Sequence, residues 1–182
     1  MSFRTIASKD ILDEYLNKIA QKDQTSLAQL YKETSASVYG YALSILKNTY
    51  DAEDVLQNCY IHVYNSAHTY KSVGKPLAWI LTITRNLCLE YLRKQTRESV
   101  MADEDWESYF NSNEHISYEN RVVLSECMKI LSDTERQVIV LHAVSGFKHR
   151  EIASIMEIPL STVLSKYNRA IKKLKAAFEK GE

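Results

Sequence analysis

The residues best suited to chemistry lie near the C-terminus, in the run from Leu160 to Phe178. Hydrogen-bonding and basic side chains recur there at the spacing of one helical face: Ser165, Asn168, Arg169 and Lys172. Apolar residues follow the same rhythm on another face: Val163, Tyr167, Ala170, Leu174, Ala177 and Phe178. No acidic residue stands between Glu157 and Glu179. A basic helix that keeps one face for packing has the size and the chemistry to enter a DNA major groove.

A shorter helix is predicted just before this run, over Phe147–Met156, with a break at Glu157-Ile158-Pro159. Pro159 cannot continue the preceding helix, but it suits the start of the next one. A helix, a tight break and a longer basic helix together make the pattern of a helix-turn-helix. Glu157 stands where the turn of this motif often carries a glycine. Two amphipathic helices of an ordinary bundle would show the same pattern, and that alternative stays open.

A second basic helix face is predicted between Pro76 and about Thr96. Its polar side carries Thr82, Arg85, Asn86, Arg93 and Arg97, with Lys94 beside them. Trp79 is interpreted as a core residue, with stacking on a base as the alternative. Tyr70 lies in the loop before it, where a tyrosine ring could stack on an unpaired base.

Three carboxylates open another predicted helix at Asp51-Ala52-Glu53-Asp54. A capping aspartate followed by acids in the first turn stabilises a helix against its dipole, which requires no further role. Glu53, Gln57 and Asn58 also share the side opposite the apolar positions. The segment is thus either a well-capped helix start or a polar surface for a basic partner.

The composition favours an all-α fold. The 182 residues include only four Gly and two Pro, and no stretch sustains the apolar–polar alternation of a strand. Further helices are predicted over Lys9–Gln21, from Thr25 or Ser26 to Lys47, over Glu119–Leu131 and over Asp133–Val144. Residues 98–121 are acidic and poorly periodic, which predicts a linker between two small helical domains.

The formal net charge is zero, but the charges are unevenly distributed. Residues 67–97 carry six Lys and Arg against one acid, residues 98–127 one base against eight acids, and residues 128–182 ten bases against six acids. Two basic blocks flank an acidic one. Because phosphate attraction depends on local charge, this pattern is compatible with nucleic-acid binding.

No residue pattern indicates an enzyme, a metal site or a cofactor. The chain has no Cys-x-x-Cys pair, no metal spacing among its five histidines and no Gly-rich phosphate loop. Cys59, Cys88 and Cys127 are expected to be buried free thiols. The first residues lack a signal-peptide core, and no run is long enough to span a membrane, so we expect a cytoplasmic protein.

In this order and spacing, these segments resemble the extracytoplasmic-function (ECF) sigma factors of bacterial RNA polymerase. The resemblance runs from about Ile11 to Glu179. It depends on six markers: Asp51-Ala52-Glu53-Asp54-Val55-Leu56-Gln57, the helix containing Ala78-Trp79-Ile80, Thr84-Arg85-Asn86-Leu87 and Tyr91-Leu92-Arg93, the acidic linker, Leu131-Ser132-Asp133-Thr134-Glu135-Arg136, Glu151-Ile152-Ala153, and Thr162-Val163 with Arg169-Ala170 and Leu174.

The resemblance implies sigma region 2 over residues 1–97, a linker over 98–121 and sigma region 4 over 122–182. It implies a non-enzymatic subunit that binds core RNA polymerase and directs it to promoter −10 and −35 elements. An anti-sigma factor is a further implied partner, with a membrane anchor on that partner as one option. A stand-alone helix-turn-helix regulator is the alternative, although such a protein would not need residues 51–97.

The resemblance also implies roles for individual residues. Core polymerase would meet Asp51, Glu53, Asp54, Gln57 and Asn58. The −10 element would meet Tyr70, Lys71, Arg85, Asn86, Arg93 and Lys94. The −35 element would meet Thr162, Ser165, Lys166, Asn168, Arg169, Lys172 and Lys173.

Within the predicted −35 surface, side-chain chemistry separates base contacts from phosphate contacts. Arg169 could pair with guanine and Asn168 with adenine, whereas the lysines would hold phosphates. Two residues depart from the family pattern: Glu90 stands where aspartate is frequent, and Leu164 where a basic residue is frequent. Leu164 could touch a thymine methyl group or simply pack, so the −35 sequence stays open.

Overall fold

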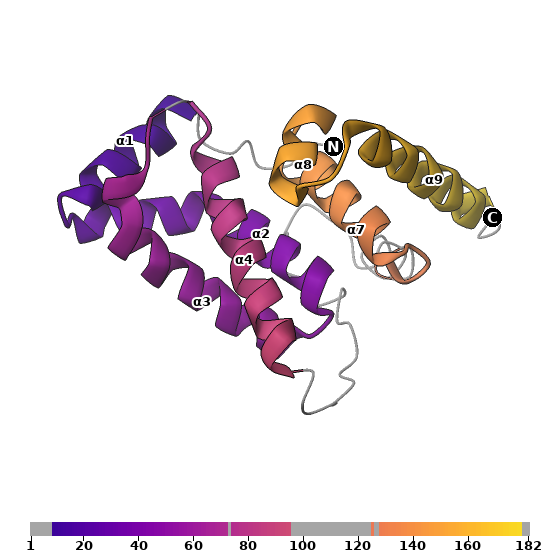
Figure 1. The fold of residues 1–182 in the computed structure, drawn as a ribbon, viewed down its shortest axis with the longest axis horizontal. Helices are drawn as coiled ribbons and strands as arrows, with labels where there is room; N and C mark the ends of the chain where they lie inside the picture. The colour runs from indigo at the N-terminus through magenta and orange to yellow at the C-terminus, as the bar shows by residue number, and fades with distance from the viewer. Residues whose placement is uncertain (1–8, 73, 96–124, 126–127, 180–182) are drawn as a thin grey trace.

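A computed structural model describes residues 9–72, 74–95, 125 and 128–179, and all regular structure in these residues is helical (Figure 1). The predicted all-α fold is therefore confirmed. The predicted linker over 98–121 and most of the predicted helix over 119–131 lie outside the described residues.

The N-terminal half, residues 9–95, is a bundle of four helices with one short 3-10 turn. The helices are α1 (Lys9–Ala20), α2 (Gln24–Leu46), α3 (Thr49–Ser66) and α4 (Pro76–Gln95), and the turn is η1 (Ala67–Thr69). Apolar residues at helical spacing meet in the centre, where Leu16, Tyr41 and Ile80 are fully buried. The α2 helix is the longest and contacts each of the other three.

The break between α2 and α3 is shorter than the sequence predicted. Lys47 ends α2 in the left-handed conformation, and Asn48 is already the N-cap of α3, with its side chain accepting from the amide of Asp51 at 3.2 Å. The predicted helix start at Asp51 is therefore wrong by two residues. Asn can cap a helix as well as Asp, and its proximity to the end of α2 concealed that role.

The C-terminal half, residues 128–179, contains α7 (Asp133–Ile139), a π-helical turn η2 (Val140–Val144), α8 (His149–Met156) and α9 (Leu160–Glu179). Ser132 and Glu135 form a capping box at the start of α7. Gly146 adopts φ +72° after η2, as expected of a glycine that terminates a helix. The predicted helix-turn-helix is present as α8 and α9, with Glu157 in the left-handed conformation between them.

The two halves contact each other through α2 and α4 on one side and α7, η2 and α8 on the other (Figure 1). The α9 helix lies on the far side of the C-terminal half, away from the four-helix bundle. Its outer face is therefore open to solvent.

Candidate nucleic-acid interfaces

The exposed face of α9 carries most of the side chains predicted to contact duplex DNA. Ser165, Asn168, Arg169, Lys172 and Lys173 are exposed, whereas Thr162 and Lys166 are partly buried. The Arg169 guanidinium lies back along its own helix, with Nε donating to the Ser165 carbonyl and Nη2 to the Ser165 hydroxyl, both at 3.3 Å. These bonds are long and exposed, so the guanidinium can leave them for a base at little cost.

Leu164 belongs to this face and not to the core. Its side chain is 40% exposed, although most leucines of the fold are buried. It precedes Ser165 and lies one helical turn before Asn168. Of the two alternatives left by the sequence, the structure thus favours a leucine available for contact over one that packs.

Lys173 differs from its neighbour Lys172 because it is tied to another helix. Its Nζ lies 2.7 Å from Oε2 of Glu135, whose side chain is only 4% exposed. Glu135 also accepts from the amide of Ser132 in the capping box. The ion pair holds α9 against the start of α7, a structural role in addition to the predicted phosphate contact.

A cluster of three rings fixes the inner face of α9. His142 and His149 are stacked at 4.8 Å between centroids, and Tyr167 meets both edge-on at 5.0 and 4.7 Å. His142 Nδ1 bonds to the carbonyl of Phe147 at 2.8 Å. Burial lowers the pKa of His149, and the neighbouring His142 lowers this pKa further. The position of His142 on the apolar side of its helix was the one signal of this cluster that could be read from the sequence.

The predicted −10 residues on the polar side of α4 differ in their exposure and in their ion-pair partners. Asn86, Arg93 and Lys94 are exposed. Lys94 pairs with Glu90 at 2.7 Å, and this hydrogen bond lowers the pKa of the Glu90 carboxyl. Arg85 instead reaches the C-terminal half, where its Nη1 lies 2.8 Å from Oε2 of Glu157.

The two predicted residues of the loop before α4 are placed differently. Lys71 is exposed. Tyr70 is partly buried, its ring lies 5.2 Å from that of Trp79, and its hydroxyl donates to the carboxylate of Asp13. Trp79 packs against the core, as predicted. In this arrangement the Tyr70 ring supports the loop, and it would have to move to stack on a base.

The start of α3 presents two carboxylates to solvent and buries a third. Glu53, Asp54, Gln57 and Asn58 are exposed. Asp51 is 8% exposed and accepts a hydrogen bond from the hydroxyl of Tyr91, which raises the pKa of Tyr91 to about 12. Asp51 therefore joins α3 to α4 inside the bundle, a contact between residues 40 positions apart that the sequence did not predict.

Comparison with known proteins places these surfaces in a family. Sigma-70 region 2 matches residues 30–98, and sigma-70 region 4 matches residues 121–174. The ECF RNA polymerase sigma factor SigK of Mycobacterium tuberculosis is 30% identical over 172 residues, 90% of this chain and 91% of SigK. SigK of Mycobacterium ulcerans is 30% identical over 173 residues, 91% of this chain and 92% of that protein.

The chain belongs to the ECF sigma factors. Two solved structures share its fold. CnrH in complex with the cytosolic domain of CnrY has a TM-score of 0.67 at 19% identity and covers 94% of this chain and 99% of its own. The sigma factor RpoE of Bartonella quintana, in complex with the anti-sigma factor NepR, has a TM-score of 0.66 at 22% identity and covers 84% and 96%.

In this ECF sigma factor, region 2 covers most of α2 together with α3 and α4, and region 4 includes α7, α8 and most of α9. The α1 helix precedes the region 2 match, but it belongs to the same bundle. Its Leu16 and Ile19 are fully buried in the shared core.

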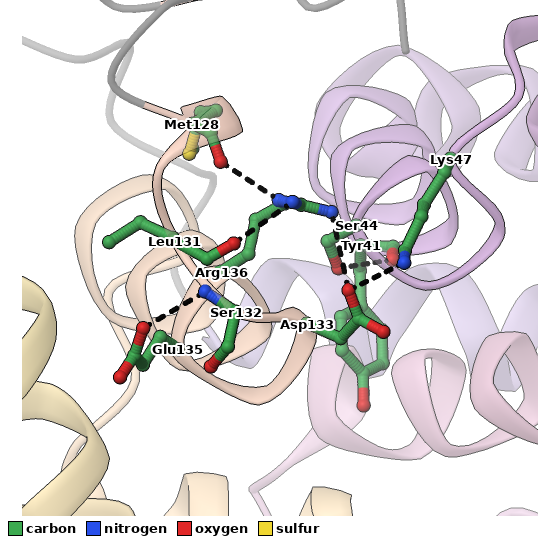
Figure 2. Close-up of polar contacts among 9 residues, drawn as sticks. All are labelled: Tyr41, Ser44, Lys47, Met128, Leu131, Ser132, Asp133, Glu135 and Arg136. Atoms are coloured by element: carbon green, nitrogen blue, oxygen red, sulfur yellow. Dashed lines mark hydrogen bonds and ion pairs between the residues drawn. The ribbon is translucent and has the colours of Figure 1, made fainter. Parts of the chain in front are cut away.

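Arg136 organises the start of region 4 (Figure 2). The residue is 3% exposed, and its Nε and Nη2 donate to the carbonyls of Met128 and Leu131, both at 3.1 Å. Its Nη1 lies 3.8 Å from Asp133, whose carboxylate is also 2.7 Å from Lys47 of region 2. The sequence marked Arg136 only as part of a family motif. An arginine at the spacing of the buried Val140 was the available signal of its burial.

Two of the three cysteines fall in the described part of the chain. Cys59 and Cys88 are free and buried, as predicted, while Cys127 lies outside it. Burial raises the pKa of Cys59 to about 11 and also raises that of Cys88. None of the described helices is long and apolar enough to cross a membrane.

Proposed function

We propose that this ECF sigma factor binds core RNA polymerase through the exposed face of α3, and that it recognises two promoter elements. In this proposal the loop 70–75 and α4 engage the −10 element, and the outer face of α9 reads the −35 element. The chain acts without chemistry of its own, in the cytoplasm, as the specificity subunit of the enzyme that it joins.

The observation that supports this proposal best is the combination of two sigma regions whose polar residues remain exposed on separate faces. The α9 face offers Ser165, Asn168, Arg169 and Lys172, and α4 offers Asn86, Arg93 and Lys94. Phosphate contacts would supply affinity on both faces, while Arg169 and Asn168 would supply base recognition. A regulator that bound only duplex DNA would have no need of the acidic α3 face.

An anti-sigma factor is a further proposed partner. The sigma factor RpoE of similar fold was solved in complex with the anti-sigma factor NepR, and CnrH, also of similar fold, with the cytosolic domain of CnrY. A partner of this kind would hold the chain away from polymerase until a signal releases it.

Core binding followed by transcription tests the proposed function. The purified chain is mixed with core polymerase from the organism that encodes it, and run-off transcripts are sequenced from a library of that genome's promoters. We expect a stable complex and a set of start sites that share −10 and −35 elements. Binding to duplex DNA without any affinity for core polymerase would instead support a stand-alone regulator.

A further inference from the structure

The turn of the helix-turn-helix docks on the α4 face that is proposed to engage the −10 element. The carboxylate of Glu157 lies 2.8 Å from the Arg85 guanidinium, and the Arg85 side chain is only 19% exposed. Asn86 and Arg93 on the same helix remain exposed. One member of the proposed −10 set is thus already occupied by an acid from the other half of the chain.

A second ion pair also joins the two halves, and its charges have the same arrangement. Lys47 of the N-terminal half lies 2.7 Å from Asp133 of the C-terminal half (Figure 2). In both pairs the base comes from region 2 and the acid from region 4. Carboxylates and phosphates bind guanidinium groups by the same charge-assisted hydrogen bonds, so Glu157 lies where a DNA phosphate could bind Arg85.

One residue of each ion pair, Lys47 and Glu157, has a backbone conformation that is unusual for a residue other than glycine. Lys47 has φ +60° and Glu157 has φ +54°, in the left-handed region that glycine adopts without strain. Among the described residues only Lys22 shares this property without being glycine. Two of these three positions therefore carry the side chains that connect the halves. Strained positions that keep a long charged side chain point to a role for that side chain.

The α8 helix also forms one wall of a groove of about 350 Å³ beside the loop 70–75, which precedes α4. Tyr70, Lys71 and Trp79 line one side, and Glu151 and Ser154 of α8 line the other. A DNA strand that follows this face of α4 would therefore meet α8 and its acidic side chain. The occupation of Arg85 by Glu157 and the wall that α8 adds to the groove would both hinder binding of DNA to this face of α4.

We propose that the helix-turn-helix turn is an internal ligand of the −10 surface, in which Glu157 holds Arg85 in the free chain and must be displaced before promoter DNA can bind. The proposal rests on the proposed function, since it assigns a competitor to the same α4 face. The contact is built for reversal, because the Glu157 side chain is 65% exposed and water can replace it.

Binding of −10 single strands to the free chain tests this competition. The probe is a labelled non-template strand of the −10 element shared by the run-off start sites, titrated with the full chain by fluorescence anisotropy. Glu157→Gln removes the charge and keeps the size and the backbone strain. We expect it to bind the strand about three- to tenfold more tightly than the wild type, because the closed form no longer competes as strongly.

Three controls separate the ion pair from other effects. Glu14→Gln removes one exposed acid from α1, and we expect no gain from it. Glu157→Gly removes the same acid and relieves the strain, and it should show the same gain as Glu157→Gln. In the complex with core polymerase, where the halves bind separate DNA elements, wild type and Glu157→Gln should bind the strand equally.

The outcomes distinguish failure of this inference from failure of the proposed function. If the polymerase complex binds the strand but Glu157→Gln gives the free chain no advantage, the internal ligand is refuted and the sigma function stands. An equal gain from Glu14→Gln would also refute it, since any loss of negative charge would then suffice. A strand that neither the free chain nor the polymerase complex binds would refute the proposed engagement of the −10 element by α4, and the absence of shared run-off start sites would refute the sigma function itself.

Small-angle X-ray scattering gives an independent measurement on the free chain. The double variant Lys47→Gln with Glu157→Gln lacks both ion pairs, and we expect it to show a larger radius of gyration than the wild type at the same moderate salt concentration. An unchanged radius would show that apolar contacts alone keep the halves together, and would contradict a role for Glu157 in closure.

Discussion

Leu164 and Lys173 show how burial assigns different tasks to residues of one helix. Leu164 is an apolar side chain on the solvent face of α9, and Lys173 is a basic side chain directed to a buried acid. On charge alone, Lys173 would be the DNA contact and Leu164 the packing residue. Their surroundings in the fold favour a different division.

Leu164 is expected to recognise a thymine methyl group in the −35 element. Replacing each thymine of the element by deoxyuridine removes only that methyl group. We expect the wild type to lose about fourfold in affinity at one position, the equivalent of about 0.8 kcal/mol for one buried methyl-sized group. Leu164→Ala should be insensitive to the same replacement in duplex titrations.

Phe178→Ala is the matched control for Leu164, because Phe178 is another exposed apolar residue of α9, near its C-terminal end. This variant should retain the full sensitivity to deoxyuridine. If Leu164→Ala were equally sensitive, the leucine would have no part in reading the base.

Lys173 is expected to contribute more to stability than to DNA binding, and Lys172 the reverse. Lys173→Met leaves the buried Glu135 carboxylate without its ion pair, which should cost about 1–2 kcal/mol and lower the melting temperature by about 2–8 °C. Lys172→Met should leave the melting temperature nearly unchanged and reduce the slope of log affinity against log salt by about one. Thermal unfolding and salt-dependent duplex titrations measure both quantities, and identical behaviour of the two variants would contradict this division.

At the scale of elements, the ring cluster of His142, His149 and Tyr167 couples η2, α8 and α9. Three rings within 5.0 Å of one another connect the helix-turn-helix to the helix before it. His149 Nε2 is buried and lacks a hydrogen-bond partner among the described residues. A second proton on this ring would therefore be poorly solvated, in agreement with the lowered pKa.

The free energy of unfolding is consequently expected to decrease as the pH is lowered below neutrality. Because folding lowers the pKa of His149, the unfolded chain takes up the proton at a higher pH than the folded chain. The stabilisation is complete above the unfolded pKa of about 6.5 and is lost as the pH falls through the folded pKa. Melting temperatures from about pH 8 to pH 5 should show this slope, and His149→Gln should reduce it.

His68→Gln provides the comparison for this pH dependence, because His68 is exposed and lies outside the ring cluster. It should keep the slope of the wild type. A slope that His149→Gln leaves intact would assign the pH dependence to other groups.

Helical elements were predictable from local patterns, but the contacts between them were not. The helix-turn-helix and the all-α fold follow from periodicity and from a break at a proline, both of which are local. The buried state of Asp51 depends on Tyr91, 40 residues away, and the occupation of Arg85 depends on Glu157, 72 residues away. Nothing in the spacing of charges indicates which of them meet across such distances.

At the scale of the whole molecule, the contact between the halves leaves the α3 face uncovered. Glu53, Asp54, Gln57 and Asn58 are all exposed while α4 and α8 are in contact. The free chain could therefore meet core polymerase before its halves separate. Core binding and release of the −10 surface are then separable events.

Reversal of charge on α3 is expected to impair core binding without unfolding the chain. Glu53→Lys with Asp54→Lys should weaken the affinity for core polymerase at least about tenfold, because like charges then oppose a basic partner surface. The matched control is Asp10→Lys with Glu14→Lys, which reverses two exposed acids on α1. Pull-down and circular dichroism measure binding and folding, and unchanged core affinity of the α3 variant would show that these acids serve only the helix dipole.

Asp133 has one partner in each half of the molecule, Arg136 within region 4 and Lys47 across from it. When the halves separate, the Asp133 carboxylate loses Lys47 but keeps Arg136, so separation leaves no buried charge without a partner. Lys47, already 40% exposed, passes directly into water. Separation of the halves at this ion pair therefore costs little in electrostatic energy, and the same pair can form again when the halves return to contact.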